Sequence, residues 1–398
     1  MKAFNSITAG CVLLVLACAG TIPAQTVVRI AGSTAFRAAT LTALTHILSV
    51  DPLHPPIYGY VGSTFTKANQ VIFTGSIVNP ATHQLIRVII KTAFAGSVGG
   101  IADLTQNLTV GPGGTAYPNG GGGWLVNSTP QSTTGTANVP ANFDPATTPD
   151  VAMSDTYQKT TPFTSPALTD TLVAVIPFVW VKSLGNPGTV FVPFNFNKTT
   201  AANLLNGALT NIQCIGRDED SGERLIAYAF AGISGSGFAQ TPANQYRPTI
   251  AGGNIIGTVP WPGPVIVDGI TYANNGHSGY ASGSALATTL NTPTRAGITT
   301  GYVGYFGVND ANDVNGGHNN LEWNGVSYTP AAVQKGQYDL WSYEHVLYRS
   351  TFTGTGKALA DKLALGILNF YANISGVFIE TMSFHRKYDG GTLIPGDE

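Results

Sequence analysis

The sequence IGRDEDSGERLIAYAF, residues 215–230, is the densest cluster of charge in a chain that otherwise carries few charged residues. Arg217 precedes three acidic residues, and Ser221-Gly222 then leads into apolar residues at helical spacing. The first amides of a helix have no partner within the helix, and the helix dipole attracts anions to that end. The planar guanidinium of Arg217 could hold two oxygen atoms of the same anion. The segment therefore predicts an anion site at the start of a helix.

An ordinary capped helix is the alternative interpretation of the same residues. Asp220 would then be the N-cap, and Glu223, three residues later, would complete a capping box. Arg217 would pair with Glu219 instead of a ligand. Capped helices are far commoner than ligand sites, so this segment alone favours the alternative.

A strand, a turn of small residues and the start of a helix follow one another three times in the chain. Residues 27–31 (VVRIA) end at Gly32-Ser33-Thr34, whose hydroxyls can cap the next helix, and residues 84–93 (QLIRVIIKTA) end at the turn 96–100 (GSVGG). Residues 215–230 supply the third case. This repetition is typical of an open α/β sheet, in which ligands bind at the carboxyl ends of the strands.

Other segments are expected to complete the sheet and its covering helices. Residues 111–149 are rich in Gly, Thr, Asn and Pro, and we expect an insertion without a core of its own. Further strands are predicted at 151–155, 172–181, 301–308 and 341–348, and helices at 199–207 and 356–371.

The composition narrows the function classes. Of 398 residues, 43% are hydrophobic, which is enough for two domains with buried cores. Charged residues make up only 10%, compared with about a quarter in typical soluble proteins. With a formal net charge of −2, nothing suggests nucleic acid or an anionic membrane as a partner.

The N-terminus has the features of an export signal. Lys2 supplies the positive charge, residues 7–19 form a short apolar core, and a small-residue cleavage site follows before Gln25. We therefore expect residues 1–24 to be a signal peptide and the mature chain to be periplasmic or extracellular. Lipid attachment at Cys18 is the alternative.

The mature chain offers few groups for catalysis or metal binding. Its single cysteine, Cys214, excludes an internal disulfide and a cysteine metal cluster. The seven histidines are scattered without metal-ligand spacing, and neither a nucleophile-elbow motif nor a phosphate-loop lysine motif is present. We expect no enzyme activity, no cofactor and no metal.

The order of motifs resembles that of the periplasmic phosphate-binding proteins of ABC transporters. The resemblance covers nearly the whole mature chain, except residues 111–149 and much of 235–297. It implies an α/β, type 2 periplasmic-binding-protein fold, with two lobes, mixed sheets, a hinge and a ligand cleft. The matching motifs are Gly32-Ser33-Thr34, the turn 96–100, Ser154-Asp155, the apolar strand 173–181, Asn206 to Asn211, Arg217 to Glu223, the strand 301–305 and the segment 328–348.

The same resemblance implies a domain arrangement in which the chain crosses between lobes twice. Lobe 1 would comprise residues 25–178, including the insertion, and lobe 2 residues 179–297. Residues 298–398 would return to lobe 1 and end with the C-terminal helix. We expect a monomer that binds phosphate or a similar small oxyanion, with an ABC permease as the candidate partner.

Eight residues are implied as contacts of the anion, and together they are called the predicted anion site. Hydroxyls and helix-terminal amides would donate to the oxygen atoms, and Arg217 would add a charged pair. Asp155, when ionised, can only accept, so it would select an oxyanion that carries a proton, such as hydrogen phosphate. The eight are Thr34, Ala35 through its amide, Ser97, Asp155, Arg217, Ser221, Gly222 and Glu223.

One of these positions departs from the family. The family has threonine where this chain has Glu223. A carboxylate pointing inward would pair with Arg217 and occupy the oxyanion position, whereas one pointing outward would leave the site open. Two functions follow: a solute-binding protein for phosphate or a related oxyanion, or an exported or cell-surface protein that has lost the ligand. A phosphate-ester hydrolase is a third hypothesis, without a motif to support it.

Overall fold

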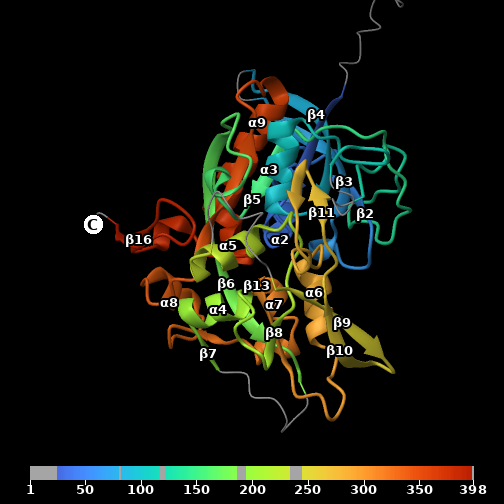
Figure 1. Cartoon of the computed structure of the whole chain (residues 1–398). Helices are drawn as coiled ribbons and strands as arrows, with labels where there is room; N and C mark the ends of the chain where they lie inside the picture. Colours follow the sequence, from blue (N-terminus) through green and yellow to red (C-terminus); the bar gives the residue numbers. More distant parts are fainter. Residues whose placement is uncertain (1–24, 80–81, 117–121, 186–193, 234–243, 397–398) are drawn as a thin grey trace, which may run out of the picture.

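A nine-stranded mixed sheet runs through the protein in the computed structural model, which describes residues 25–79, 82–116, 122–185, 194–233 and 244–396 (Figure 1). The expected signal peptide, including Cys18, lies outside the described residues. The predicted α/β class with mixed sheet pairing is confirmed. In spatial order, the strands are β2 (Ile57–Tyr60), β3 (Gln70–Val78), β4 (Leu85–Phe94), β1 (Thr26–Gly32), β5 (Val151–Ser154), β15 (Trp341–Tyr348), β6 (Thr169–Lys182), β13 (Gly301–Gly307) and β8 (Ile212–Cys214).

Strand β6 connects two parts of this sheet. Its first section, up to Pro177, pairs antiparallel with β15, and its second section, from Phe178 to Lys182, pairs antiparallel with β13. Strand β13 in turn pairs parallel with β8. The middle of β6 is continuously buried, which explains its apolar sequence. We call the strands β1–β5 and β15, with their helices, the first part, and β8 and β13, with theirs, the second part.

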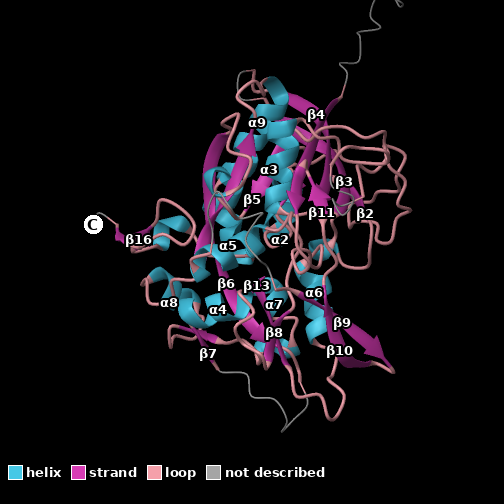
Figure 2. Ribbon diagram, viewed as in Figure 1, coloured by secondary structure: helices cyan, strands magenta, loops and turns pink. Residues whose placement is uncertain are grey.

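The helices are divided between these two parts (Figure 2). Helices α2 (Arg37–Ile47) and α9 (Gly354–Gly366) pack against each other on the first part, where α3 (Ser97–Gln106) lies against β1 and β5. The second part contains α4 (Lys198–Leu205), α5 (Gly222–Ala231), α6 (Gly283–Leu290) and α7 (Val308–Ala311), and the short α8 (Pro330–Gln334) precedes β15.

In the described part of the chain, no helix is both long and apolar enough to cross a membrane.

Four two-stranded sheets are attached to this framework. They are formed by β9 (Tyr246–Ala251) with β10 (Asn254–Pro260), β11 (Val265–Val267) with β12 (Ile270–Tyr272), β7 (Asn195–Phe196) with β14 (Glu322–Trp323), and β16 (Phe384–His385) with β17 (Ile394–Pro395).

The end of the predicted C-terminal helix differs from expectation. A single helix was expected over residues 356–371, but the α-helical hydrogen bonding of α9 ends at Gly366 and a π-helical turn, Ile367–Tyr371, follows. The apolar spacing alone does not show where i→i+4 hydrogen bonding gives way to i→i+5 hydrogen bonding. The predicted lobe boundaries stay a prediction. The return of the chain to lobe 1 was predicted at residue 298, and β13, which follows it, pairs with β8.

The insertion, residues 111–149, covers one face of the first part. Its described residues form neither helix nor strand, yet Trp124, Leu125 and Val139 are buried. Leu125 and Val139 pack on Ile72 and Ile89 of the sheet, whose strand neighbours face the main core on the other side. Trp124 packs in a second cluster with Ala31 and Ala93. The insertion therefore has no core of its own, as expected, but it completes that of the sheet.

Glycine is required at the turn between β1 and α2. Gly32 has a φ of 104°, and a Cβ atom there would lie 2.0 Å from the backbone oxygen of Met153. This close approach allows Ser33 N–H to donate to the same oxygen at 2.8 Å. The turn thereby holds the residues after it beside the end of β5.

We expect Gly32→Ala to destabilise the protein more than Gly62→Ala. Both glycines have positive φ, at 104° and 98°, but a Cβ atom at Gly62 would meet nothing within 4 Å. The steric clash at Gly32 should therefore cost about 1–3 kcal/mol beyond the loss for Gly62→Ala, by analogy with other overpacked sites. Urea denaturation of both variants measures this difference. Equal losses would contradict the tight turn described above.

Candidate functional site

The structure brings all eight residues of the predicted anion site together where the two parts of the sheet meet. Thr34 and Ala35 lie in the turn before α2, Ser97 begins α3, and Asp155 follows β5. The other four come from the loop and first turn of α5, and every one of the eight is buried. Binding of an anion by these residues stays a prediction.

Arg217 is the centre of this cluster. Its side chain is fully buried, with Nε donating to the carbonyl of Tyr280 at 2.9 Å. Nη2 donates to Thr34 Oγ1 at 3.2 Å and to the carbonyl of Ala281 at 3.1 Å. Nη1 donates to Glu223 Oε2. The guanidinium thus already uses most of its donors within the protein.

Glu223 points inward and occupies the position facing Arg217. Its Oε2 accepts from Arg217, and its Oε1 accepts from Gly307 N–H at 2.9 Å. The residue is only 2% exposed. Of the two orientations considered from the sequence, the structure has the inward one, with both carboxylate oxygens bonded to groups of the protein.

The capping arrangement at α5 differs from the one considered from the sequence. Ser221, and not Asp220, is the N-cap, and its hydroxyl accepts from Arg224 N–H at 3.3 Å. Glu219 lies 3.6 Å from Arg224 and does not pair with Arg217. Ser221 can cap because its backbone is extended while Gly222 already begins the helix, which places Glu223 in the first turn beside Arg217.

The N-terminus of α3 is also satisfied by the protein itself. Val98 N–H and Gly99 N–H donate to the backbone oxygen of Asp220, at 2.9 and 3.3 Å. Gly96 permits this approach, since a Cβ atom there would lie 2.2 Å from that oxygen. Two of the amides that this helix would offer to an anion are therefore bonded to a peptide carbonyl.

Asp155 and Ser97 close the remaining side of the site. Asp155 N–H donates to the Ser97 hydroxyl at 3.1 Å, and Ser33 Oγ donates to Asp155 Oδ2 at 3.4 Å. A Cβ atom on Gly222 would lie 1.7 Å from Asp155 Oδ1. The carboxyl group of Asp155 therefore rests directly against the start of α5, where glycine leaves room for it.

Buried carboxyl groups are in excess around Arg217. Burial, and then the negative charge of Glu223, raises the pKa of Asp155 to about 7. Burial also raises the pKa of Asp218 to about 7, although Arg217 opposes the shift. Burial and the neighbouring Asp155 raise the pKa of Glu344 well above its usual range. Several of these acids therefore hold protons near neutral pH, which lowers the negative charge around Arg217.

Some residues of the site were not predicted from the sequence. The N–H of Gly307 and the hydroxyl of Tyr305, which accepts from Arg217 N–H at 3.1 Å, both come from β13. Gln245 donates from Nε2 to the Arg217 carbonyl at 2.8 Å. Nothing in their local sequence indicates these roles. Glu344 could have been noticed from the sequence. It is an acidic residue in the strand 341–348, which carries no other charged residue apart from His345.

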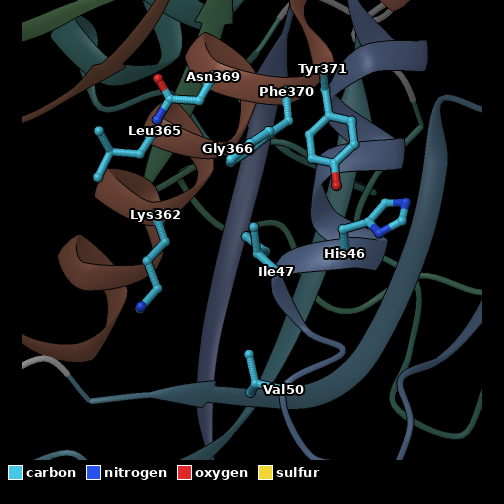
Figure 3. A pocket seen from close by; sticks show the side chains of 9 residues that line it. All are labelled: His46, Ile47, Val50, Lys362, Leu365, Gly366, Asn369, Phe370 and Tyr371. Atoms are coloured by element: carbon cyan, nitrogen blue, oxygen red, sulfur yellow. The ribbon is translucent and has the colours of Figure 1, made fainter.

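A separate hollow lies between the ends of α2 and α9 (Figure 3). Its volume is about 360 Å³, and it includes Leu365 and Phe370, which are 57% and 68% exposed. His46 stacks on Tyr371 at its edge, with ring centroids 4.9 Å apart. None of the eight residues of the predicted anion site lines it.

The solved structures that are similar to this chain share little of its sequence. No family model and no curated protein matches the chain. A phosphate ABC transporter substrate-binding protein from Clostridium perfringens, with bound phosphate, shares 12% identity over 89% of this chain and 100% of that chain, with a TM-score of 0.49. An ABC-type phosphate transport receptor from Vibrio cholerae shares 14% identity over 86% and 98%, with a TM-score of 0.42.

A third solved structure of this kind is the Synechocystis CcmR regulatory domain in complex with 2-PG. It shares 10% identity over 87% of this chain and 99% of that chain, with a TM-score of 0.39.

Asp155→Asn should reduce the dependence of stability on pH. Between about pH 4 and pH 7 the folded protein keeps a proton on Asp155 that the unfolded chain has lost, so the free energy of unfolding falls as pH rises. One such group contributes up to about 1.4 kcal/mol per pH unit. Urea denaturation at pH 5 and pH 7.5 measures the fall, which should be smaller in the variant.

Asp361→Asn is a suitable control for this measurement. Asp361 is a half-exposed carboxylate on α9 that pairs with Lys357, far from the site in sequence. This variant should keep the pH dependence of the wild type. If Asp155→Asn also keeps it, the proton on Asp155 does not contribute as described.

Proposed function

We propose that this chain is an exported, non-enzymatic protein of the solute-binding fold whose anion site is filled by its own Glu223. Its role is then structural or one of interaction with other molecules, and it does not carry phosphate. The observation that supports this is the pairing of Arg217 with Glu223 inside a fully buried cluster. The carboxylate provides the charge and the two acceptor oxygens that an anionic ligand would provide.

Competition with Glu223 is unfavourable for a free anion. Glu223 is tethered six residues from Arg217, so it meets the guanidinium without the loss of translational freedom that a phosphate ion incurs. An anion entering beside Glu223 would face like-charge repulsion of about 4 kcal/mol at 4 Å, for an effective dielectric constant of about 20. We therefore expect no phosphate binding at the concentrations that transport proteins use.

Oxyanion carriage for an ABC transporter is the second candidate. It is favoured by the convergence of Thr34, Ser97, Asp155 and Arg217 on one place, together with the start of α5. In this case Glu223 would have to leave Arg217 when the two parts separate. The ligand would be phosphate or a related oxyanion, and an ABC permease would receive it.

Calorimetric titration with inorganic phosphate tests the two candidates. We expect no heat of binding to the wild type up to millimolar phosphate. Glu223→Thr should bind phosphate, because it frees Arg217 and removes the competing charge, and Glu223→Thr/Arg217→Ala should not. Arg217→Ala alone is a poor control, since it leaves a buried carboxylate unpaired at a cost of about 3–5 kcal/mol.

The outcomes separate the candidates clearly. Tight 1:1 binding of phosphate to the wild type would overturn the first candidate and support carriage. A folded Glu223→Thr variant that does not bind would show that these residues do not form an anion site. Far-UV circular dichroism of each variant establishes that it is folded.

A further inference from the structure

Two cationic side chains of the first part contact the second part beside the predicted anion site. Arg37, on α2, places Nη2 3.4 Å from Ser284 Oγ on α6 and 3.8 Å from Asp310 Oδ1 on α7. Lys67, in the short helical turn Phe65–Lys67, places Nζ 2.5 Å from Asp313 Oδ2. We call these contacts the latch. All of them join residues that lie far apart in the sequence.

Arg37 is held in position for this role. Its Nη1 donates to Asn69 Oδ1 at 2.6 Å, and the side chain is only 3% exposed. Asp310 is similarly buried, with a side chain that is 7% exposed. A buried and anchored pair of this kind is screened less by salt than the more exposed Lys67–Asp313 pair.

The latch lies at a hollow next to the anion site. This hollow, of about 190 Å³, is lined by Arg37, Lys67 and Asp310, and also by Thr34 and Ala35. Thr34 is the residue of the first part that accepts from Arg217 of the second part. The latch and the Arg217–Thr34 bond therefore close the same boundary between the two parts.

We propose that the latch keeps the two parts closed in the absence of any ligand. In a protein that closes around a solute, the solute supplies contacts to both parts, and closure depends on its binding. Here Arg37, Lys67 and Arg217 supply contacts across the boundary from the chain itself. The inference requires that the two parts can move relative to each other, and it does not depend on whether phosphate binds.

Distance measurements between spin labels test the latch. Labels at Leu365→Cys on α9 and Thr288→Cys on α6 place one probe on an exposed helical position of each part. The natural Cys214 is buried and should stay unlabelled. With no anion added, the parent should show one distance, and Arg37→Ala/Lys67→Ala should add a population at longer distance.

A matched control is available on α9 itself. Lys357 pairs with Asp361 at 2.6 Å within one helix, so Lys357→Ala removes a similar ion pair that does not join the two parts. This control should keep the distance of the parent. If Arg37→Ala/Lys67→Ala does not fold, Lys67→Ala, at a half-exposed residue, should give a smaller shift in the same direction.

Two results would overturn the proposal. One is a latch variant, folded by circular dichroism, that keeps the single distance of the parent. The other is a parent that already shows the longer distance without anion. Because no phosphate is added, failure of the latch can be distinguished from failure of the proposed function, which the phosphate titration decides.

Discussion

The buried ion pair between Arg217 and Glu223 is the interaction on which the arrangement of the site depends. A buried pair is stable only when hydrogen bonds satisfy the remaining donors and acceptors of both groups. Here the carbonyls of Tyr280 and Ala281 and the hydroxyl of Thr34 satisfy Arg217, and the N–H of Gly307 satisfies Glu223. The pair therefore fixes the relative position of four segments of the chain.

The N-termini of the helices around this pair also form hydrogen bonds within the chain. The first amides of α3 are bonded to the Asp220 carbonyl, and the start of α5 is capped by Ser221. Each of these bonds does within the chain what an anion would otherwise do. These helix termini are therefore bonded within the chain, and the latch between Arg37, Lys67 and α6–α7 adds further contacts of the same kind.

Much of this organisation could be predicted from the sequence, because it depends on local spacing. The strand at residues 341–348 is found at Trp341–Tyr348, and the turns after β1 and β4 lead into α2 and α3 as expected. The eight residues of the predicted anion site also meet in space. Their grouping follows from the order of strands and turns, which brings the ends of β1, β4 and β5 together.

The orientation of individual side chains could not be predicted in this way. Glu223 points inward because Gly307 N–H, 84 residues later in the chain, and Arg217 both bond to it. Asp220 is not the N-cap, because its backbone oxygen is needed at the start of α3. Both outcomes depend on tertiary partners that the sequence around residues 215–230 does not contain. Local sequence patterns predict where these residues meet, whereas long-range contacts determine which group pairs with Arg217.

Glu223 influences the site in two ways: one acts against a bound oxyanion, and the other against the selection of an oxyanion that carries a proton. It takes the Nη1 donor of Arg217 directly. It also adds to burial in raising the pKa of Asp155 to about 7, so that Asp155 is partly protonated at neutral pH. A protonated Asp155 has lost part of its capacity to accept a hydrogen bond from a ligand that carries a proton. A single residue therefore both pairs with Arg217 and weakens the selectivity that was predicted for Asp155.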